Sequence, residues 1–308
     1  STLPFTSLNW NSAQPVTVTG VNDNVSDDNV TSTITVAINQ GRTNDAKYDA
    51  LSSQSVSVTT TDGVDAATFT IAETDNATLV SESGGTDTFN VVLGSEPTGN
   101  VVFSLTAGDG TEVSLSALVL TFSTSNWNTA QTVTVTGVND NVSDDNVTST
   151  ITVAINQSNT ADTKYDALSS QSVTVSTTDD DTAAFTVTES GGSTVVAESG
   201  STDAIVVTLS SEPTGNVVLS LTNSDNETSL SASTLTFTPS NWNSAQDVTI
   251  TGVDDNIDDD NVTSTITVAI NQSSTADTKY DALDNKSVSV TTTDNDSVPT
   301  LTLSLIHI

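Results

Sequence analysis

The chain lacks the residue types on which several common functions depend. Its 308 residues contain no Cys, no Met and a single His, His307. Without Cys there are no disulfides, no metal–thiolate sites and no thiol nucleophile. A single His excludes a multi-His zinc site and leaves little basis for a His-dependent triad. Paired carboxylates can hydrolyse glycosides, but here the acidic groups recur in every repeat. The sequence therefore predicts a protein that is not an enzyme.

Basic residues are also scarce. Five Lys and Arg residues face 39 Asp and Glu residues, giving a formal net charge of −34. Nucleic acids and anionic membranes are excluded as partners, because no cationic surface exists to bind phosphates. No run of about 18 apolar residues exists, so no membrane insertion is expected. Such a charge repels itself in a compact state unless cations neutralise it.

The chain repeats itself. Trp10, Trp127 and Trp242 lie 117 and 115 residues apart, and each begins the same pattern: an aromatic residue, an alternating Val/Thr run and an acidic loop. A period of this length predicts tandem domains rather than a short-repeat solenoid. We expect the second half of a repeat at 1–63 (the half-repeat) and complete repeats at 64–181 and 182–296. Residues 297–308 would begin another repeat.

The last six residues match nothing after the earlier repeats. Residues 303–308 correspond to the translation of a transposase adapter used in sequencing libraries, so we interpret them as an artefact. The alternative is a short strand that opens a further domain.

Alternating β-branched residues predict strands throughout. In the first complete repeat the pattern occupies residues 86–93, 100–106, 131–137, 148–155 and 171–177, with shorter apolar runs before and between them. About seven short strands in some 115 residues, separated by turns, are typical of an immunoglobulin-like sandwich. The fold class predicted is all-β: tandem, immunoglobulin-like, seven-stranded antiparallel β-sandwiches. The same alternation at 14–20 predicts a strand in the half-repeat.

Acidic residues cluster at three places in each complete repeat: an early Glu, an acidic loop, and the exit of the last strand. In a sandwich, loops that join alternate strands meet at one end. Clustered carboxylates there repel one another unless a hard cation bridges them, and Ca²⁺ accepts six to eight oxygen ligands. A solvated acidic surface is the alternative.

Three motifs carry a family resemblance: Leu79-Val80-Ser81-Glu82-Ser83-Gly84-Gly85-Thr86, Val133-Thr134-Val135-Thr136-Gly137-Val138-Asn139-Asp140-Asn141, and Val173-Thr174-Val175-Ser176-Thr177-Thr178-Asp179-Asp180-Asp181. The chain resembles the Calx-beta domains, calcium-binding sandwiches that also occur in large bacterial surface proteins. The Asn126-Trp127-Asn128-Thr129-Ala130-Gln131 motif is similar to the tandem repeats of long secreted adhesins, including those of the RTX type. The resemblance implies Ca²⁺ ligands at Glu82, Asp140, Asp144, Asp179, Asp180, Asp181, Glu198, Asp255, Asp259, Asp294 and Asp296. Val147 and Val262 stand where the family often has a further acidic ligand.

Aromatic residues recur once per repeat. We interpret Trp10, Trp127 and Trp242 as packing anchors, with glycan stacking as the alternative. The Tyr of the Lys-Tyr-Asp-Ala-Leu motif is expected to fold back on the sandwich, while Asp162 and Asp166 beside Tyr165 are expected to be solvated.

The function predicted is that of a stalk segment of a large, extracellular or cell-surface adhesin, with Ca²⁺ at the junctions between neighbouring repeats. The alternatives are a glycan- or protein-binding module and non-catalytic repeats of a secreted enzyme. Any surface glycan or host partner would be bound by domains outside this sequence.

Overall fold

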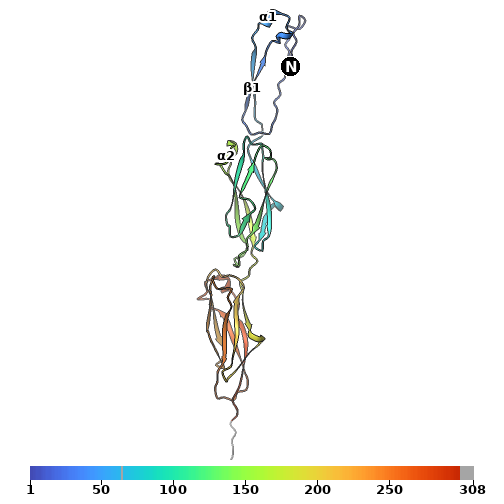
Figure 1. Cartoon of the computed structure of the whole chain (residues 1–308). Helices are drawn as coiled ribbons and strands as arrows, with labels where there is room; N and C mark the ends of the chain where they lie inside the picture. The colour runs from blue at the N-terminus through green and yellow to red at the C-terminus, as the bar shows by residue number, and fades with distance from the viewer. Residues whose placement is uncertain (64, 299–308) are drawn as a thin grey trace, which may run out of the picture.

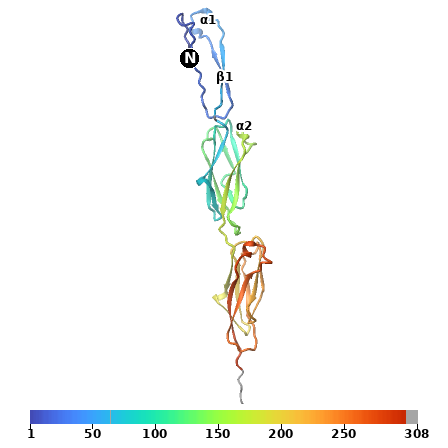
Figure 2. The ribbon, with the colours of Figure 1, turned by 180° about the vertical axis from the view of Figure 1, so that it is seen from behind.

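The computed structural model describes residues 1–63 and 65–298. The half-repeat and the two complete repeats follow one another end to end in an elongated chain (Figures 1 and 2). The tail at 303–308, which the sequence interprets as an artefact, lies outside the described residues. No helix among the described residues is long and apolar enough to cross a membrane.

The first complete repeat is a sandwich of two sheets. Its strands are β3 (Phe69–Glu73), β4 (Thr78–Ser81), β5 (Thr86–Leu93), β6 (Val101–Ala107), β7 (Val113–Leu115), β8 (Val119–Phe122), β9 (Gln131–Gly137), β10 (Val147–Ile155) and β11 (Gln171–Thr178). One sheet has the order β3-β5-β9-β7, and the other has the order β4-β11-β10-β6-β8.

The second complete repeat has the same arrangement. Its strands are β12 (Phe185–Glu189), β13 (Thr194–Ala197), β14 (Thr202–Leu209), β15 (Val217–Asn223), β16 (Thr228–Leu230), β17 (Thr234–Phe237), β18 (Gln246–Gly252), β19 (Val262–Ile270) and β20 (Lys286–Thr293). Its sheets have the orders β12-β14-β18-β16 and β13-β20-β19-β15-β17.

These topologies confirm the predicted all-β, immunoglobulin-like sandwich and refine it in two respects. Each complete repeat has nine strands rather than seven. The two strands not predicted are β4 and β7. A short 3₁₀ turn, η2 (Thr74–Asn76), separates β4 from β3, and the two strands join opposite sheets. In addition, β4 pairs with β11 in parallel, although every other pair in this repeat is antiparallel. This parallel pair positions the acidic residues described below.

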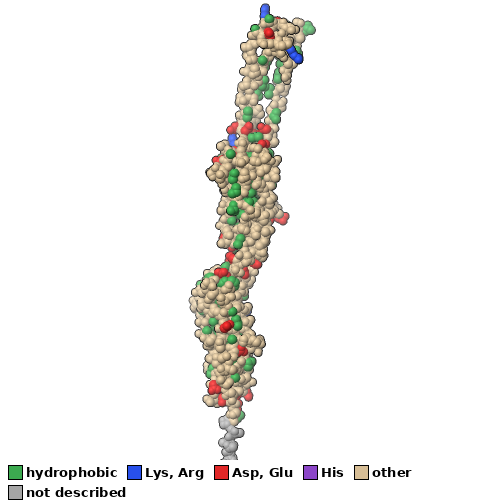
Figure 3. Space-filling view, viewed as in Figure 1, with side chains coloured by type: hydrophobic (Ala, Val, Ile, Leu, Met, Phe, Trp, Pro, Cys, Tyr) green, Lys and Arg blue, Asp and Glu red, His purple; other side chains and the backbone are tan. Residues whose placement is uncertain are grey.

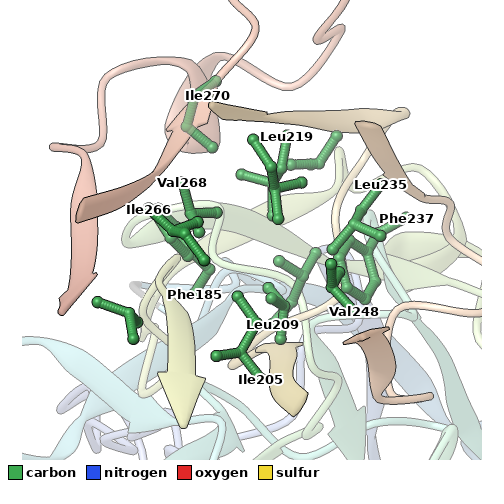
Figure 4. Packing of buried hydrophobic residues seen from close by; sticks show 14 of the residues in the cluster. Phe185, Ile205, Leu209, Leu219, Leu235, Phe237, Val248, Ile266, Val268 and Ile270 are labelled. Atoms are coloured by element: carbon green, nitrogen blue, oxygen red, sulfur yellow. The ribbon is translucent and has the colours of Figure 1, made fainter. Parts of the chain in front are cut away.

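The inward-facing apolar residues of the alternating strands fill the cores, as the sequence predicts. Phe89, Val91 and Leu93 of β5 are buried together with the inward residues of β6 and β9. Two T-shaped ring pairs reinforce this core, Phe69 with Phe103 at 4.9 Å and Phe103 with Phe122 at 5.8 Å. The second repeat has a separate core of the same kind (Figure 4). Because the cores are separate, each repeat depends on its own apolar packing.

The half-repeat has no such core. It forms only the pair β1 (Val30–Val36) and β2 (Gln54–Thr60), and Val56 is 57% exposed whereas its equivalent Val173 is 1% exposed. The strand predicted at 14–20 is wrong, because no strand forms there. The equivalent strand β9 pairs with β5 and β7, both from the first half of a repeat. Residues 14–20 have neither neighbour, so alternation alone does not make them a strand.

The recurring Trp and Tyr residues pack as predicted in the complete repeats but not in the half-repeat. Trp127 and Trp242 are partly buried against the cores of their repeats, whereas Trp10 in the half-repeat is 67% exposed. Tyr165 and Tyr280 are buried, and Tyr48 is exposed. The anchors therefore pack only where a complete sandwich exists to receive them.

Candidate metal sites

The parallel pairing of β4 and β11 brings two distant acidic segments together. The register aligns Ser81 with Thr178, so the two strands end side by side. Glu82 follows β4, and Asp179 follows β11. The backbone N–H of Glu82 donates to the carbonyl of Thr178 at 3.1 Å, which extends the ladder to the end of the strands. Residues 97 positions apart therefore share one end of the sandwich.

The third segment is the acidic loop, residues 138–146, which joins β9 to β10. Its entry passes closely over β4, because a Cβ on Gly137 would lie 2.1 Å from the carbonyl oxygen of Ser81. The Asp179 carboxylate then holds the C-terminal part of this loop through hydrogen bonds. Asp179 Oδ2 accepts from the backbone N–H groups of Asp144 and Asp145, each at 3.0 Å, and Oδ1 accepts from that of Asp181 at 2.7 Å.

Two clusters of three carboxylates result, and both include Glu82. Ligand oxygens of Glu82, Asp144 and Asp179 lie within 4.8 Å of one another, as do those of Glu82, Asp180 and Asp181. Five of the six residues predicted as ligands in this repeat are thus brought together. The sixth, Asp140, is in neither group, and its Oδ1 accepts from the backbone N–H of Val142 at 2.7 Å.

Glu82 is the unusual member of this cluster. It is 1% exposed, and its Oε2 atom is buried without a hydrogen-bond partner. Within the described part of the chain, the two ion pairs are Lys164–Asp28 and Lys279–Asp145, so neither neutralises Glu82. A buried, unpaired carboxylate beside other carboxylates is costly unless it is protonated or bound to a cation.

Electrostatics follow from this burial. Desolvation, followed by the charges of Asp140 and Asp179, raises the pKa of Glu82 to about 7. Desolvation and then Asp140 also raise the pKa of Asp144, and desolvation and then Asp180 raise that of Asp181. Glu82, Asp144 and Asp181 therefore resist carrying their negative charges together.

Sequence reasoning missed Glu112, which immediately precedes β7. It is 4% exposed, and its Oε2 atom is also buried without a partner. Burial, and then the charge of Asp144, raises the pKa of Glu112. Its carbonyl accepts from the N–H of Val138 at 2.9 Å, which holds it beside the start of the acidic loop. The signal available was its recurrence as Glu227 at the equivalent place before β16.

The second complete repeat repeats the arrangement with fewer members. Glu198 follows β13 and is 1% exposed; its ligand oxygen lies within 4.8 Å of those of Asp294 and Asp296 beyond β20. Asp255 and Asp259, in the acidic loop 253–261, are not in this group. Burial raises the pKa of Glu198, although the N–H of Asn295 opposes the shift by donating to its carboxylate.

The acidic side chains gather where one repeat meets the next (Figure 3). The six ligands predicted in the first complete repeat lie at the end that faces the second, and the five predicted in the second lie at its corresponding end. Eight of the eleven form groups of three within the described residues. The burial of Glu82, its orphaned oxygen and the carboxylate donor set fit a hard cation such as Ca²⁺. Whether these residues ligate a metal stays a prediction.

Comparison with known proteins gives little beyond architecture. No protein-family model matches the chain, and no curated protein matches it significantly. Among solved structures, it is similar to the D0-D1 domain of intimin, with 18% identity, 73% of this chain and 94% of that chain covered, and a TM-score of 0.25. It is also similar to the calcium binding domain CBD12 of CALX1.1, with 15% identity, 65% and 80% coverage, and a TM-score of 0.28. The titin domains z1z2 in complex with telethonin give 13% identity, 76% and 98% coverage, and a TM-score of 0.34. At these identities and TM-scores the likenesses say nothing about what this chain binds.

Proposed function

We propose that the chain is a stalk segment of a large secreted or cell-surface adhesin, in which Ca²⁺ binds at the acidic end of each complete repeat. The observation that carries this proposal is the buried carboxylate of Glu82, whose Oε2 has no partner and which shares a cluster with Asp144 and Asp179. A metal-free cluster of this kind is destabilising, whereas a divalent cation supplies the missing charge and the missing ligand contacts.

Calcium suits the donor set because every acidic side chain offers only oxygen atoms. It tolerates six to eight ligands in irregular geometry, whereas Mg²⁺ requires a near-ideal octahedron and keeps several waters. Extracellular calcium sites have dissociation constants of about 10⁻⁴ to 10⁻³ M, which suits a cell-surface location. A cation that binds only the folded state at a hundredfold excess over Kd stabilises it by about 2.7 kcal/mol.

The mechanical role follows from which segments the ion would join. Glu82 ends β4, Asp179 follows β11, and Asp144 belongs to the acidic loop. One ion bound to all three would tie two strands of one sheet to the loop that arrives from β9 of the other sheet, at the end of the repeat that faces the next one. The loop would then hold its contact with the neighbouring repeat in one geometry, and the stalk would be stiffer.

The glycan-binding alternative receives no support from the aromatic residues. Trp127 and Trp242 use their rings against the hydrophobic cores, as packing anchors do. Trp10 is exposed, but it belongs to the half-repeat, where the sheet that would cover its equivalent is lacking.

Thermal unfolding of the full chain tests the proposal. We expect the melting temperature in millimolar Ca²⁺ to exceed that in EGTA, and Mg²⁺ to give a smaller increase. The variant Glu82→Gln/Glu198→Gln should lose most of the Ca²⁺-dependent increase. Asp247→Asn, which removes one charge from an exposed position on β18, is the matched control and should retain it. Equal melting temperatures of the wild-type chain in Ca²⁺ and EGTA would exclude the calcium role.

A further inference from the structure

Consecutive repeats are joined by a backbone contact that occurs twice with the same geometry. Val142 in the acidic loop of the first complete repeat forms a parallel β-bridge with Glu212 of the second, and the N–H of Glu212 donates to the carbonyl of Asn141 at 2.6 Å.

The half-repeat meets the first complete repeat in the same way. Val25 forms a parallel bridge with Glu96, whose N–H donates to the carbonyl of Asn24 at 2.8 Å. A chance contact between adjacent domains would not reproduce the same bridge at equivalent residues of both junctions.

A lysine completes each contact. Lys279 of the second complete repeat pairs with Asp145 of the first, and Lys164 of the first pairs with Asp28 of the half-repeat. Two of the five basic residues of the chain are thus placed at the two junctions. Lys47 occupies the equivalent position in the half-repeat, and within the described residues it forms no ion pair.

The receiving surface is held rigid by a buried Asp and Tyr. In the first complete repeat, Asp162 Oδ2 accepts from the N–H and the hydroxyl of Thr98 at 2.7 and 2.9 Å. Its Oδ1 caps the one-turn helix α2 (Thr163–Asp166) by accepting from the N–H groups of Lys164 and Tyr165. The Tyr165 hydroxyl donates to the carbonyl of Ser95 at 2.7 Å and accepts from its N–H at 3.2 Å.

These bonds fasten the loop that carries Glu96 to the helix that carries Lys164. Asp277, Tyr280, Thr214 and Ser211 repeat every one of them beneath Glu212 and Lys279. The prediction that Asp162 is solvated is therefore wrong: it is 1% exposed, and Asp166 is half-buried.

We propose that this surface is a socket that receives the acidic loop of the preceding repeat and so sets the direction and angle of the joint. The socket consists of the Ser-Glu-Pro-Thr-Gly loop (95–99 or 211–215) and the helix-turn lysine (Lys164 or Lys279). The partner of the loop at 253–261, whose Asn256 and Ile257 correspond to Asn141 and Val142, is then the socket of a further repeat of this type. That socket would offer the loop a free backbone N–H beside a lysine ammonium.

The joint works without a metal ion. Its contacts are backbone hydrogen bonds and an ammonium–carboxylate pair, and none of them uses a carboxylate oxygen of Glu82, Asp144 or Asp179. Lys279 and Asp145 also line an open hollow of about 670 Å³ between the repeats, together with Asp179 and Asp181. The lysine therefore supplies positive charge to the rim of an acidic hollow in the metal-free chain.

Spin-label distances across the joint test the socket. The chain has no Cys, so Thr174→Cys and Ser289→Cys would provide the only labelling sites, at equivalent exposed positions of β11 and β20. Distances would be measured by pulsed electron paramagnetic resonance on the full chain in EGTA. We expect a narrow distribution in the parent chain, and a broader distribution centred at a different distance in Lys279→Glu, which sets two carboxylates against each other.

Two further variants complete the design. Lys47→Glu makes the same charge change at the equivalent lysine with no loop opposite it, and should leave the distribution unchanged. Asp145→Asn combined with Lys279→Glu removes the repulsion, so its distribution should be narrower than that of Lys279→Glu alone. About 1 M NaCl, where the Debye length is about 3 Å, should broaden the parent distribution.

An unchanged distribution in Lys279→Glu, or equal broadening in Lys279→Glu and Lys47→Glu, would overturn the socket. A double variant as broad as Lys279→Glu alone would equally overturn the pairing. Because EGTA removes the proposed ion, these outcomes stand whether or not the calcium proposal fails.

Discussion

The buried carboxylate of Glu82 makes the stability of the metal-free chain depend on pH in an unusual direction. Its pKa is about 7 in the folded chain and 4.5 as the reference for an unfolded one. Between these values the folded state retains a proton that the unfolded chain has released. The free energy of unfolding therefore falls as the pH rises from 4.5 to 7, and is level above that range. Most paired carboxylates produce the opposite slope.

The size of the effect follows from the same shift. A change of one pKa unit corresponds to about 1.36 kcal/mol, so the shift of Glu82 corresponds to at most about 3 kcal/mol. Water that reaches the exposed Asp144 screens the cluster, so a smaller value is expected. Glu82→Gln removes this term, because the amide carries no charge at any of these pH values. The variant should be more stable than the parent in EGTA at pH 8 and less stable in Ca²⁺.

Urea unfolding at pH 5, 6, 7 and 8 in EGTA measures this difference. Replacing Trp10 and Trp242 with Phe leaves Trp127, which packs on the core of the first complete repeat, as the single tryptophan reporter. The parent should lose stability from pH 5 to 7, and Glu82→Gln should lose distinctly less. The remaining slope would come from Glu112, Asp144 and Asp181, whose pKa values burial also raises. Parallel pH profiles, with the variant no more stable at pH 8, would refute the reasoning.

Two further substitutions test the structure around the sites. Tyr165→Phe removes three hydrogen bonds to Ser95 and should lower the stability of its repeat by about 1–3 kcal/mol in urea unfolding; Tyr48→Phe, at an exposed site, should be neutral. Gly137→Ala sets a Cβ 2.1 Å from the Ser81 carbonyl and should destabilise by about 1–3 kcal/mol or more. Gly110→Ala, where a Cβ meets nothing within 4 Å, is its control. Equal stability of either variant and its control would contradict the close contacts described.

Local alternation predicted most of the fold. Every inward residue predicted on β5 and β6 is buried, because period-2 patterning of β-branched and aromatic residues specifies one face of a strand. The same pattern failed at 14–20, where Val16 and Val18 are exposed. Alternation specifies which face a strand buries, but it cannot supply the neighbouring strands that make it a strand.

The candidate site was predictable in its residues more than in its geometry. Glu82 and Asp179 were identified from charge recurrence and resemblance, but their adjacency depends on the parallel pairing of β4 with β11. That pairing follows from the turn between β3 and β4, where Asp75 adopts φ 55° and the chain passes from one sheet to the other. A long-range parallel pair leaves no short-range pattern in the sequence.

Asp162 shows the opposite case, a signal present but misinterpreted. In each repeat an Asp stands two residues before the lysine of the Lys-Tyr-Asp-Ala-Leu motif, at positions 45, 162 and 277. Asp is a preferred helix N-cap residue. In all three places it caps a one-turn helix. The recurrence of an acidic residue was interpreted through charge, whereas hydrogen bonding decides its place here.

The acidic loop of the first complete repeat unites the two proposed roles. Asp144 lies in the carboxylate cluster, while Asn141, Val142 and Asp145 contact the second complete repeat. Asp179 connects the carboxylate cluster to the residues at the junction, because one of its oxygens accepts from the N–H groups of both Asp144 and Asp145. An ion that fixes Asp144 and Asp179 would therefore also fix the residues that enter the socket. Since such coupling is reciprocal, seating the loop in the socket would raise the affinity for the ion by the same factor. A chain of such joints would bind calcium more tightly within the stalk than at an end where the loop meets no socket.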